Sequence, residues 1–169
     1  MLLALITGAS SGIGLATARV LARQGARVCI TGRNETALRS LVDEIGGSAG
    51  YVVGDLTEPG FCKHVVTEAA EQMGGLTTLV NCAGVLQGGA FGSEACNLEN
   101  FKFNFNHNTL TVFEMMEDAI PHLKQAAASA NDEMPRNTTA IVNVSSTNGK
   151  QSFGACATYC ASKVLDICL

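Results

Sequence analysis

The stretch "LLALITGASSGIG", residues 2–14, joins a run of apolar residues to a loop of small residues. Apolar residues at helical spacing follow in "GIGLATARVLARQG", residues 12–25. A strand, a tight turn and a helix in this order form the first half of a βαβ unit. Glycines in the turn let the backbone approach a ligand, and the start of the helix can hold a pyrophosphate. The stretch therefore predicts an α/β fold with a phosphate-binding loop.

Four further apolar runs are bounded by turn residues: "ARVCIT" (26–31), "GYVVGD" (50–55), "LTTLVN" (76–81) and "TAIVNVSS" (139–146). Their apolar character is nearly continuous, as in parallel strands that are buried on both faces. Helical patterns separate these runs, so we predict a doubly wound parallel β-sheet in a three-layer αβα arrangement.

The helices are predicted from their caps and their apolar faces. In the first helix, Ile13, Ala16, Val20 and Leu21 share one face, and Gly25 is placed to end the helix. Three more helices are expected: one after the N-cap Asn34, one capped by Thr57 with Pro59 in its first turn, and one from Asn97 to Lys124. The segment "AAASANDEMPRNTT", residues 126–139, is predicted to be an exposed connection before the fifth strand.

Length and composition restrict the class of protein. A chain of 169 residues that is 47% hydrophobic suits a single domain, residues 1–169. The net charge is −4 and the Lys and Arg residues are scattered, so nucleic acid is not an expected partner. The start, "MLLALITGAS", is too short in apolar residues for a signal peptide or a membrane span, and we expect a cytoplasmic protein with no membrane partner. Seven scattered cysteines indicate reduced thiols, and no metal site is predicted.

Three motifs occur in a fixed order: "TGASSGIG" (7–14), "NCAG" (81–84) and "YCASK" (159–163). Together they resemble the short-chain dehydrogenase/reductase family, of the single-domain Rossmann type, with Cys82 in place of the second asparagine of the family's NNAG motif. The resemblance implies a Rossmann-like fold that binds NAD(P). The cofactor-binding positions that it implies are Gly8, Ser10, Ser11, Gly12, Ile13, Gly14, Asp55, Leu56, Asn81, Ala83, Gly84, Tyr159 and Lys163. Asp55 resembles the acid that contacts adenine, and the alternative for it is a cap of the next helix.

The resemblance also implies the catalytic residues Asn108, Ser146, Tyr159 and Lys163. Ser146 stands thirteen residues before Tyr159, as in the family, and its neighbour Ser145 is the second candidate. The remaining position is assigned by counting back thirteen residues from the "PHL" segment at Pro121, which gives Asn108. Two nearby asparagines, Asn104 and Asn106, are alternatives, and His107 replaces the usual apolar residue before the catalytic asparagine.

These residue types suit the reduction of a carbonyl or the oxidation of an alcohol. The nicotinamide carries the hydride, and a tyrosine moves the proton. A tyrosine ordinarily titrates at about 10, and a nearby cation lowers that value by stabilising the phenolate. Lys163 is one helical turn from Tyr159, and Ser146 can donate a hydrogen bond to the substrate oxygen. In the family, the asparagine holds a water that links the lysine to solvent.

The residues after the second strand indicate the choice of cofactor. An acidic side chain there would bind a ribose 2′-hydroxyl, but the sequence is "ITGRN", residues 30–34. Gly32 leaves room, and Arg33 supplies a guanidinium suited to a 2′-phosphate, so NADP(H) is favoured over NAD(H). A solvated arginine with no ligand is the alternative.

The family usually continues past YxxxK through further strands and a substrate loop. We therefore expect a chain that is truncated within the helix carrying Tyr159 and Lys163, with the C-terminal strands missing. Two functions stay open: an NADP(H)-dependent oxidoreductase acting on a small-molecule carbonyl or secondary alcohol, or a truncated, inactive dinucleotide-binding remnant. The resemblance implies a homo-oligomer for a full-length form, paired through the helix from Asn97 to Lys124 and the final helix.

Overall fold

The computed structural model describes residues 1–47, 49–129 and 139–168. The chain forms two compact units. Unit 1 consists of Met1–Ala83 and Glu114–Val142, and unit 2 of Gly84–Phe113 and Asn143–Leu169. Most of the predicted connection over residues 126–139 lies outside the described residues, but its first three residues belong to a helix, which corrects that boundary.

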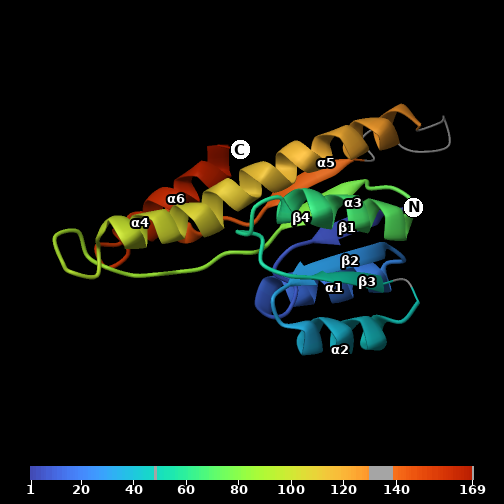
Figure 1. Ribbon diagram of the computed structural model, residues 1–169, viewed down its shortest axis with the longest axis horizontal. Coiled ribbons are helices and arrows are strands. Elements are labelled where there is room, and N and C mark those ends of the chain that lie inside the picture. Colours follow the sequence, from blue (N-terminus) through green and yellow to red (C-terminus); the bar gives the residue numbers. More distant parts are fainter. Residues whose placement is uncertain (48, 130–138, 169) are drawn as a thin grey trace. The chain divides into compact units, whose positions relative to one another are not determined.

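A five-stranded sheet is the centre of unit 1 (Figure 1). Its strands are β1 (Leu3–Ile6), β2 (Arg27–Gly32), β3 (Ala49–Val53), β4 (Thr78–Asn81) and β5 (Ala140–Asn143). The order is β3-β2-β1-β4-β5, and β1 pairs in parallel with β2 and β4, as β2 does with β3. All five predicted strands are confirmed.

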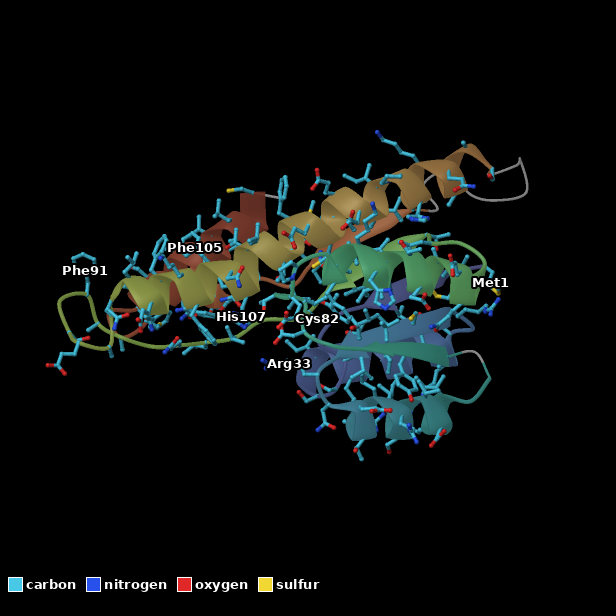
Figure 2. The ribbon with its side chains drawn as sticks, in the orientation of Figure 1. Met1, Arg33, Cys82, Phe91, Phe105 and His107 are labelled. Carbon is cyan, nitrogen blue, oxygen red and sulfur yellow. The ribbon has the colours of Figure 1, made fainter. Side chains whose placement is uncertain are left out.

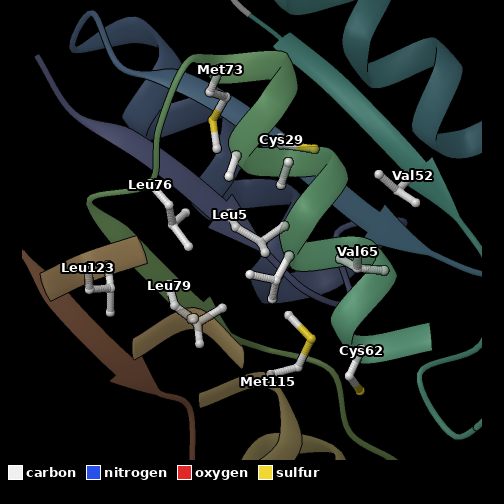
Figure 3. Packing of buried hydrophobic residues seen from close by; sticks show 14 residues of the cluster. Leu5, Cys29, Val52, Cys62, Val65, Met73, Leu76, Leu79, Met115 and Leu123 are labelled. Atoms are coloured by element: carbon white, nitrogen blue, oxygen red, sulfur yellow. The ribbon is translucent and has the colours of Figure 1, made fainter. Parts of the chain in front are cut away.

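Helices cover both faces of this sheet. Helices α1 (Gly12–Arg23) and α2 (Glu35–Ile45) pack on one face, where Ile6 and Ile30 meet Ala18 and Leu38. On the other face lie α3 (Phe61–Met73) and the unit 1 part of α5 (Thr111–Ala128). There the buried cluster includes Leu5, Val65, Leu79, Met115 and Leu123 (Figure 3). Successive side chains of a strand point to opposite faces, so β1 to β4 contribute to both clusters, whereas β5 contributes Ile141 to the cluster under α3 alone. The doubly wound α/β prediction is confirmed.

The apolar face predicted for α1 is only partly the face that packs on the sheet. Leu21 packs against the buried cluster, as that prediction requires. Ile13 and Val20 are 62% and 51% exposed and Ala16 is exposed, whereas Gly14 and Ala18 are buried. The fully buried residues of the helix are small because its backbone lies very close to the preceding loop: a Cβ on Gly14 would stand 2.6 Å from the Gly8 carbonyl oxygen. The predicted end of the helix is confirmed, since Gly25 follows the C-cap Gln24 with a φ of 86°.

The predicted start of α3 is wrong. The helix begins at Phe61 after Gly60, which has a φ of 77°, so Thr57 is not its cap and Pro59 is not in its first turn. The N–H and hydroxyl of Thr57 both donate to Asp55 Oδ1, at 3.0 and 2.8 Å, and this closes a turn before the helix.

Unit 2 contains α4 (Leu98–Phe105), a π-helical turn η1 (Asn106–Leu110), the first three residues of α5, a short 3-10 turn η2 (Thr147–Gly149) and α6 (Ala157–Cys168). Two predicted N-caps are confirmed: Asn97 Oδ1 accepts from the Asn100 N–H at 2.9 Å, and in unit 1 Asn34 Oδ1 accepts from the Ala37 N–H at 3.1 Å. The single helix predicted from Asn97 to Lys124 is interrupted by η1 and ends later, at Ala128. Among the described residues, no helix is both long and apolar enough to cross a membrane.

Candidate active site

The predicted phosphate loop joins β1 to α1 in unit 1. A Cβ on Gly8, whose φ is 65°, would stand 2.8 Å from the backbone of Ala83, and one on Gly14 would meet the Gly8 carbonyl. Gly12 differs, because its φ is 55° but nothing lies within 4 Å of where its Cβ would be. Ser10 lies beside Gly32, whose Cβ would be 3.2 Å from the Ser10 Oγ, and Ser11 and Ile13 are exposed. The loop is therefore tightly packed on the side of the sheet and open at Gly12.

Thr7 connects this loop to the "NCAG" segment. Its Oγ1 accepts hydrogen bonds from the N–H groups of Cys82 and Ala83, at 3.1 and 3.0 Å, and the residue is 1% exposed. Asn81, at the end of β4, is buried. The structure thus brings the loop and the segment together at the carboxyl edge of the sheet, where ligands bind in open α/β sheets. Thr7 is not among the predicted site residues, although its place at the end of an apolar strand is a signal in the sequence.

Arg33 and Asp55 also lie at this edge, beyond the ends of β2 and β3. In Figure 2, Arg33 and Cys82 lie at the end of the unit 1 sheet opposite Met1. The Arg33 Nη1 is 3.6 Å from Asp55 Oδ2, and the two side chains are 64% and 31% exposed. Asp55 closes the turn with Thr57 and does not cap α3, so that alternative reading is wrong. Leu56 is partly buried against the cluster under α3.

In unit 2, Asn108 lies in η1 and is 0% exposed. Its Oδ1 accepts from the Val85 N–H at 2.8 Å, and its Nδ2 donates to Val85 O at 2.9 Å and to Ser162 Oγ at 3.0 Å. A π-helical turn within an α-helix is rare and is frequently found at a functional site. The alternatives for Asn108 are placed differently, since Asn104 is buried in another set of hydrogen bonds and Asn106 is the first residue of the turn.

Lys163 is 5% exposed, and its Nζ donates to Val144 O at 3.1 Å. Gly84 lies beside both Lys163 and Asn108: a Cβ there would stand 3.5 Å from Lys163 Nζ and 3.3 Å from Asn108 Oδ1. The structure therefore brings together three predicted site residues, and a Cβ at Gly84 would be tight against the amide and in ordinary contact with the ammonium.

The two candidate serines have different partners. Ser145 Oγ donates to the Lys163 carbonyl at 2.8 Å, which ties the segment before η2 to α6 within unit 2. Ser146 is the N-cap of η2, and its Oγ accepts from the Asn148 N–H at 3.2 Å. The hydroxyl proton of Ser146 is not used in that bond and can be donated to another acceptor. Tyr159 is in the first turn of α6 and is partly buried, and within the described residues of unit 2 its phenol makes no hydrogen bond.

Comparison with known proteins agrees with these motifs. A family model described as short chain dehydrogenase matches residues 2–165. The chain is 34% identical over 163 residues to 2,5-dichloro-2,5-cyclohexadiene-1,4-diol dehydrogenase LinX of Sphingobium indicum, covering 95% of this chain and 60% of that protein. It is also 34% identical over 163 residues to a cyclohexanol dehydrogenase of Acinetobacter sp., covering 95% of this chain and 61% of that protein.

Among solved structures, it is similar to the crystal structure of a variant of actinorhodin polyketide ketoreductase with NADPH. The TM-score is 0.82 and the identity 31%, over 95% of this chain and 59% of that one. The chain thus spans about 60% of the length of the relatives it matches. Since the family model covers nearly every residue, the chain belongs to the short-chain dehydrogenase family.

Proposed function

We propose that the protein is an NADP(H)-dependent oxidoreductase that transfers a hydride between the nicotinamide and a small-molecule carbonyl or secondary alcohol. The observation that carries this proposal is the buried Lys163 ammonium, which lies with Asn108 around Gly84 and one helical turn after Tyr159. The Lys163 Nζ donates to the Val144 carbonyl, and an ammonium one helical turn from a tyrosine can stabilise the phenolate of that tyrosine. Membership of a dehydrogenase family supports the same reaction.

The loop in unit 1 fits a dinucleotide. Gly12 leaves open space at the start of α1, and the side chain of the N-cap Ser11 makes no capping bond, so the first N–H groups of the helix can donate to phosphate oxygens. Ser10, Ser11 and Ile13 would line the phosphates. Asp55 and Leu56 would lie against the adenine, and Asn81, Ala83 and Gly84 along the nicotinamide half. When bound, the cofactor supplies or accepts the hydride.

The chain's own residues would transfer the proton to and from the substrate oxygen. In reduction, the Tyr159 phenol gives its proton to the substrate oxygen, while the Ser146 hydroxyl donates a hydrogen bond to the same atom. The Lys163 ammonium stabilises the phenolate that remains. Asn108 Oδ1 has one lone pair beyond its bond to Val85, so it can accept from a water that returns a proton from solvent. In oxidation, the same groups act in the opposite direction.

The preference for NADP(H) rests on Arg33. Its guanidinium is exposed, and its contact with Asp55, at 3.6 Å, is a weak surface ion pair that a phosphate could replace. Ser10 stands beside Gly32, so a hydroxyl and a guanidinium flank the place expected for a ribose 2′-phosphate. A carboxylate directly after β2 would repel that phosphate, and residues 32–34 carry none.

We further propose that the two units form one NAD(P)-binding domain, residues 1–169, that works in the cytoplasm without nucleic-acid or membrane partners. Each unit holds part of the same set of motifs, and no disulfide joins any of the seven cysteines, all of which lie in the described residues.

A full-length form is proposed to be a homo-oligomer. On unit 2 a groove of about 730 Å³ is lined chiefly by apolar side chains of α4, η1, α5 and α6, including Phe101, Phe113 and Leu165. An exposed apolar surface of this kind is typical of a subunit contact. Sedimentation velocity on the full-length protein should show a dimer or larger species, and a monomer at micromolar concentration would contradict this proposal.

The reaction is tested with the complete gene product, NADPH and a reactive diketone. Tyr159→Phe should lower turnover by about 100-fold or more, because the phenol proton is lost, while the Kd for NADPH stays within about threefold. Lys163→Ala should lose turnover and part of the cofactor affinity. A parent protein that binds NADPH without any turnover would favour the inactive binding remnant, and a Tyr159→Phe enzyme with ordinary rates would contradict the mechanism.

A further inference from the structure

A line of buried polar residues separates α4 from α6 in unit 2. Asn100, Asn104 and Asn108 are spaced four apart along α4 and η1, on one face, and are 2%, 0% and 0% exposed. Thr158 and Ser162, also four apart and buried, face them from α6. The two helices lie side by side (Figure 1). Contacts between helices are usually apolar, so these five residues, here called the polar seam, need another explanation.

Direct side-chain bonds cross the seam at two levels. Asn104 Nδ2 donates to Thr158 Oγ1 at 2.9 Å, and Asn108 Nδ2 donates to Ser162 Oγ at 3.0 Å. The Thr158 hydroxyl in turn donates to Asn100 Oδ1. Each α6 hydroxyl thus meets an amide of the facing helix, and Thr158 both accepts and donates.

The same amides hold the backbone that follows β4. Asn104 binds both backbone groups of Gln87, accepting from its N–H at 3.1 Å and donating to its carbonyl at 3.0 Å. Asn100 Nδ2 donates to the carbonyls of Gln87 and Gly88, at 3.3 and 3.1 Å. The asparagines therefore have a fixed orientation before α6 is considered, and they present their remaining groups to α6 in a defined direction.

Hydrogen bonds are directional, whereas apolar contacts tolerate sliding and rotation. If α6 turned about its axis or shifted along it, buried amides would lose partners, at the cost of desolvated polar groups. Thr158 and Ser162 immediately precede Tyr159 and Lys163 in the sequence. Because successive helical residues point about 100° apart, fixing the first pair fixes the direction of the second.

We infer that Asn104 and Thr158 are positioning residues for Tyr159, and that their hydrogen bond sets the direction in which the phenol leaves α6. The inference rests on the function proposed for Tyr159 and assigns neither residue a contact with substrate. Asn104 was an alternative for the catalytic asparagine, and the structure gives it this different role.

The test removes one hydroxyl and keeps the shape of the side chain. Thr158→Val loses the bonds to Asn104 and Asn100, while Asn104 Nδ2 keeps the Gln87 carbonyl as an acceptor and Asn100 Oδ1 keeps Asn104 Nδ2 as a donor. Thr158→Ser keeps the hydroxyl, and Thr158→Ala removes it without adding volume. The control is Thr111→Val, which removes a buried hydroxyl that donates to the His107 carbonyl, one turn back along the chain. All are made in the complete gene product, and kcat, KM for NADPH, Tm and the NMR signals of ¹³C-labelled tyrosine are measured.

Thr158→Val and Thr158→Ala should lower kcat by about tenfold or more, leave KM for NADPH within about threefold and shift the Tyr159 ring signal, which is assigned by its loss in Tyr159→Phe. Thr158→Ser should restore kcat and the signal, and Thr111→Val should change neither. An unchanged kcat and ring signal in both variants, or a Thr158→Ser enzyme as impaired as Thr158→Val, would overturn the inference. If the parent shows no turnover, the proposed function fails, but the ring signal still decides whether the seam orients Tyr159.

Discussion

At the scale of single residues, the three glycines of the phosphate loop are required for different reasons. Gly8 and Gly14 stand where any Cβ would collide with backbone atoms, so they allow the loop, α1 and the "NCAG" segment to pack closely. Gly12 has only a left-handed backbone conformation to justify it, together with open space beside it. Only the open space beside Gly12 is direct evidence of room for a ligand.

This difference predicts unequal costs of substitution. Gly14→Ala should destabilise the protein by at least about 2 kcal/mol, because the Gly8 carbonyl cannot move without displacing the loop. Gly12→Ala should cost about 1 kcal/mol from its φ alone. Gly47→Ala is the control, since that glycine is exposed, has no positive φ and has no atom near a new Cβ. Urea unfolding measures all three, and equal effects at Gly12 and Gly14 would contradict the packing argument.

Arg33 gives the second residue-scale prediction. Arg33→Gln removes the guanidinium proposed to bind the 2′-phosphate, so the Kd for NADPH should rise by about tenfold while that for NADH changes by less than about threefold. Arg39→Gln is a matched control, because Arg39 is 62% exposed, compared with 64% for Arg33, and pairs with Glu35 on α2. Titration of both cofactors decides the point. A loss of NADPH affinity that is equal in the two variants would remove the specific role of Arg33.

At the scale of elements, the N-terminal ends of α4 and α1 are expected to have different roles, one in stability and the other in cofactor binding. Asn97 caps α4 with a side-chain hydrogen bond, whereas Ser11 stands at the same position of α1 and makes none. The first-turn N–H groups of α4 are thus partly used by the protein, and those of α1 are left for a phosphate in the proposed complex.

Alanine at Asn97 and alanine at Ser11 should therefore affect different properties, stability in the first case and cofactor binding in the second. Asn97→Ala should lower the free energy of unfolding by about 1 kcal/mol, because the Asn100 N–H loses its acceptor. Ser11→Ala should leave stability within about 0.5 kcal/mol and instead weaken NADPH binding. Chemical denaturation and cofactor titration of both variants test this. A Ser11→Ala protein as destabilised as Asn97→Ala would show that Ser11 is a structural cap.

At the scale of the whole molecule, the elements could be predicted from sequence far better than their contacts. The five strands were found because a buried parallel strand needs an apolar run, and the loop motifs were then expected at the ends of those strands. The face of α1 was partly mispredicted because hydrophobicity favoured Ile13 and Val20, whereas close packing selected Gly14 and Ala18. The polar seam could not be predicted, since Asn104 and Thr158 are 54 residues apart in the chain. No local pattern couples such a pair.

The stability of the molecule should also depend on pH through two core thiols. Burial raises the pKa of Cys29 and of Cys62 from 9.0 to about 12, with a smaller effect of nearby Glu114 on Cys62. Between about pH 9 and pH 12 these thiols lose their protons in the unfolded chain and keep them in the folded protein. The stability that the two thiols contribute is therefore complete below about pH 9 and falls as the pH rises. The free energy of unfolding falls by at most about 1.4 kcal/mol per pH unit for each thiol.

Urea unfolding from pH 8 to pH 11 tests this dependence. The free energy of unfolding of Cys29→Ala and of Cys62→Ala should each fall less steeply with pH than that of the parent, while Cys168→Ala, which removes an exposed thiol, should match the parent. Parallel curves for all four proteins would contradict the role of burial, because the remaining titrations are common to them.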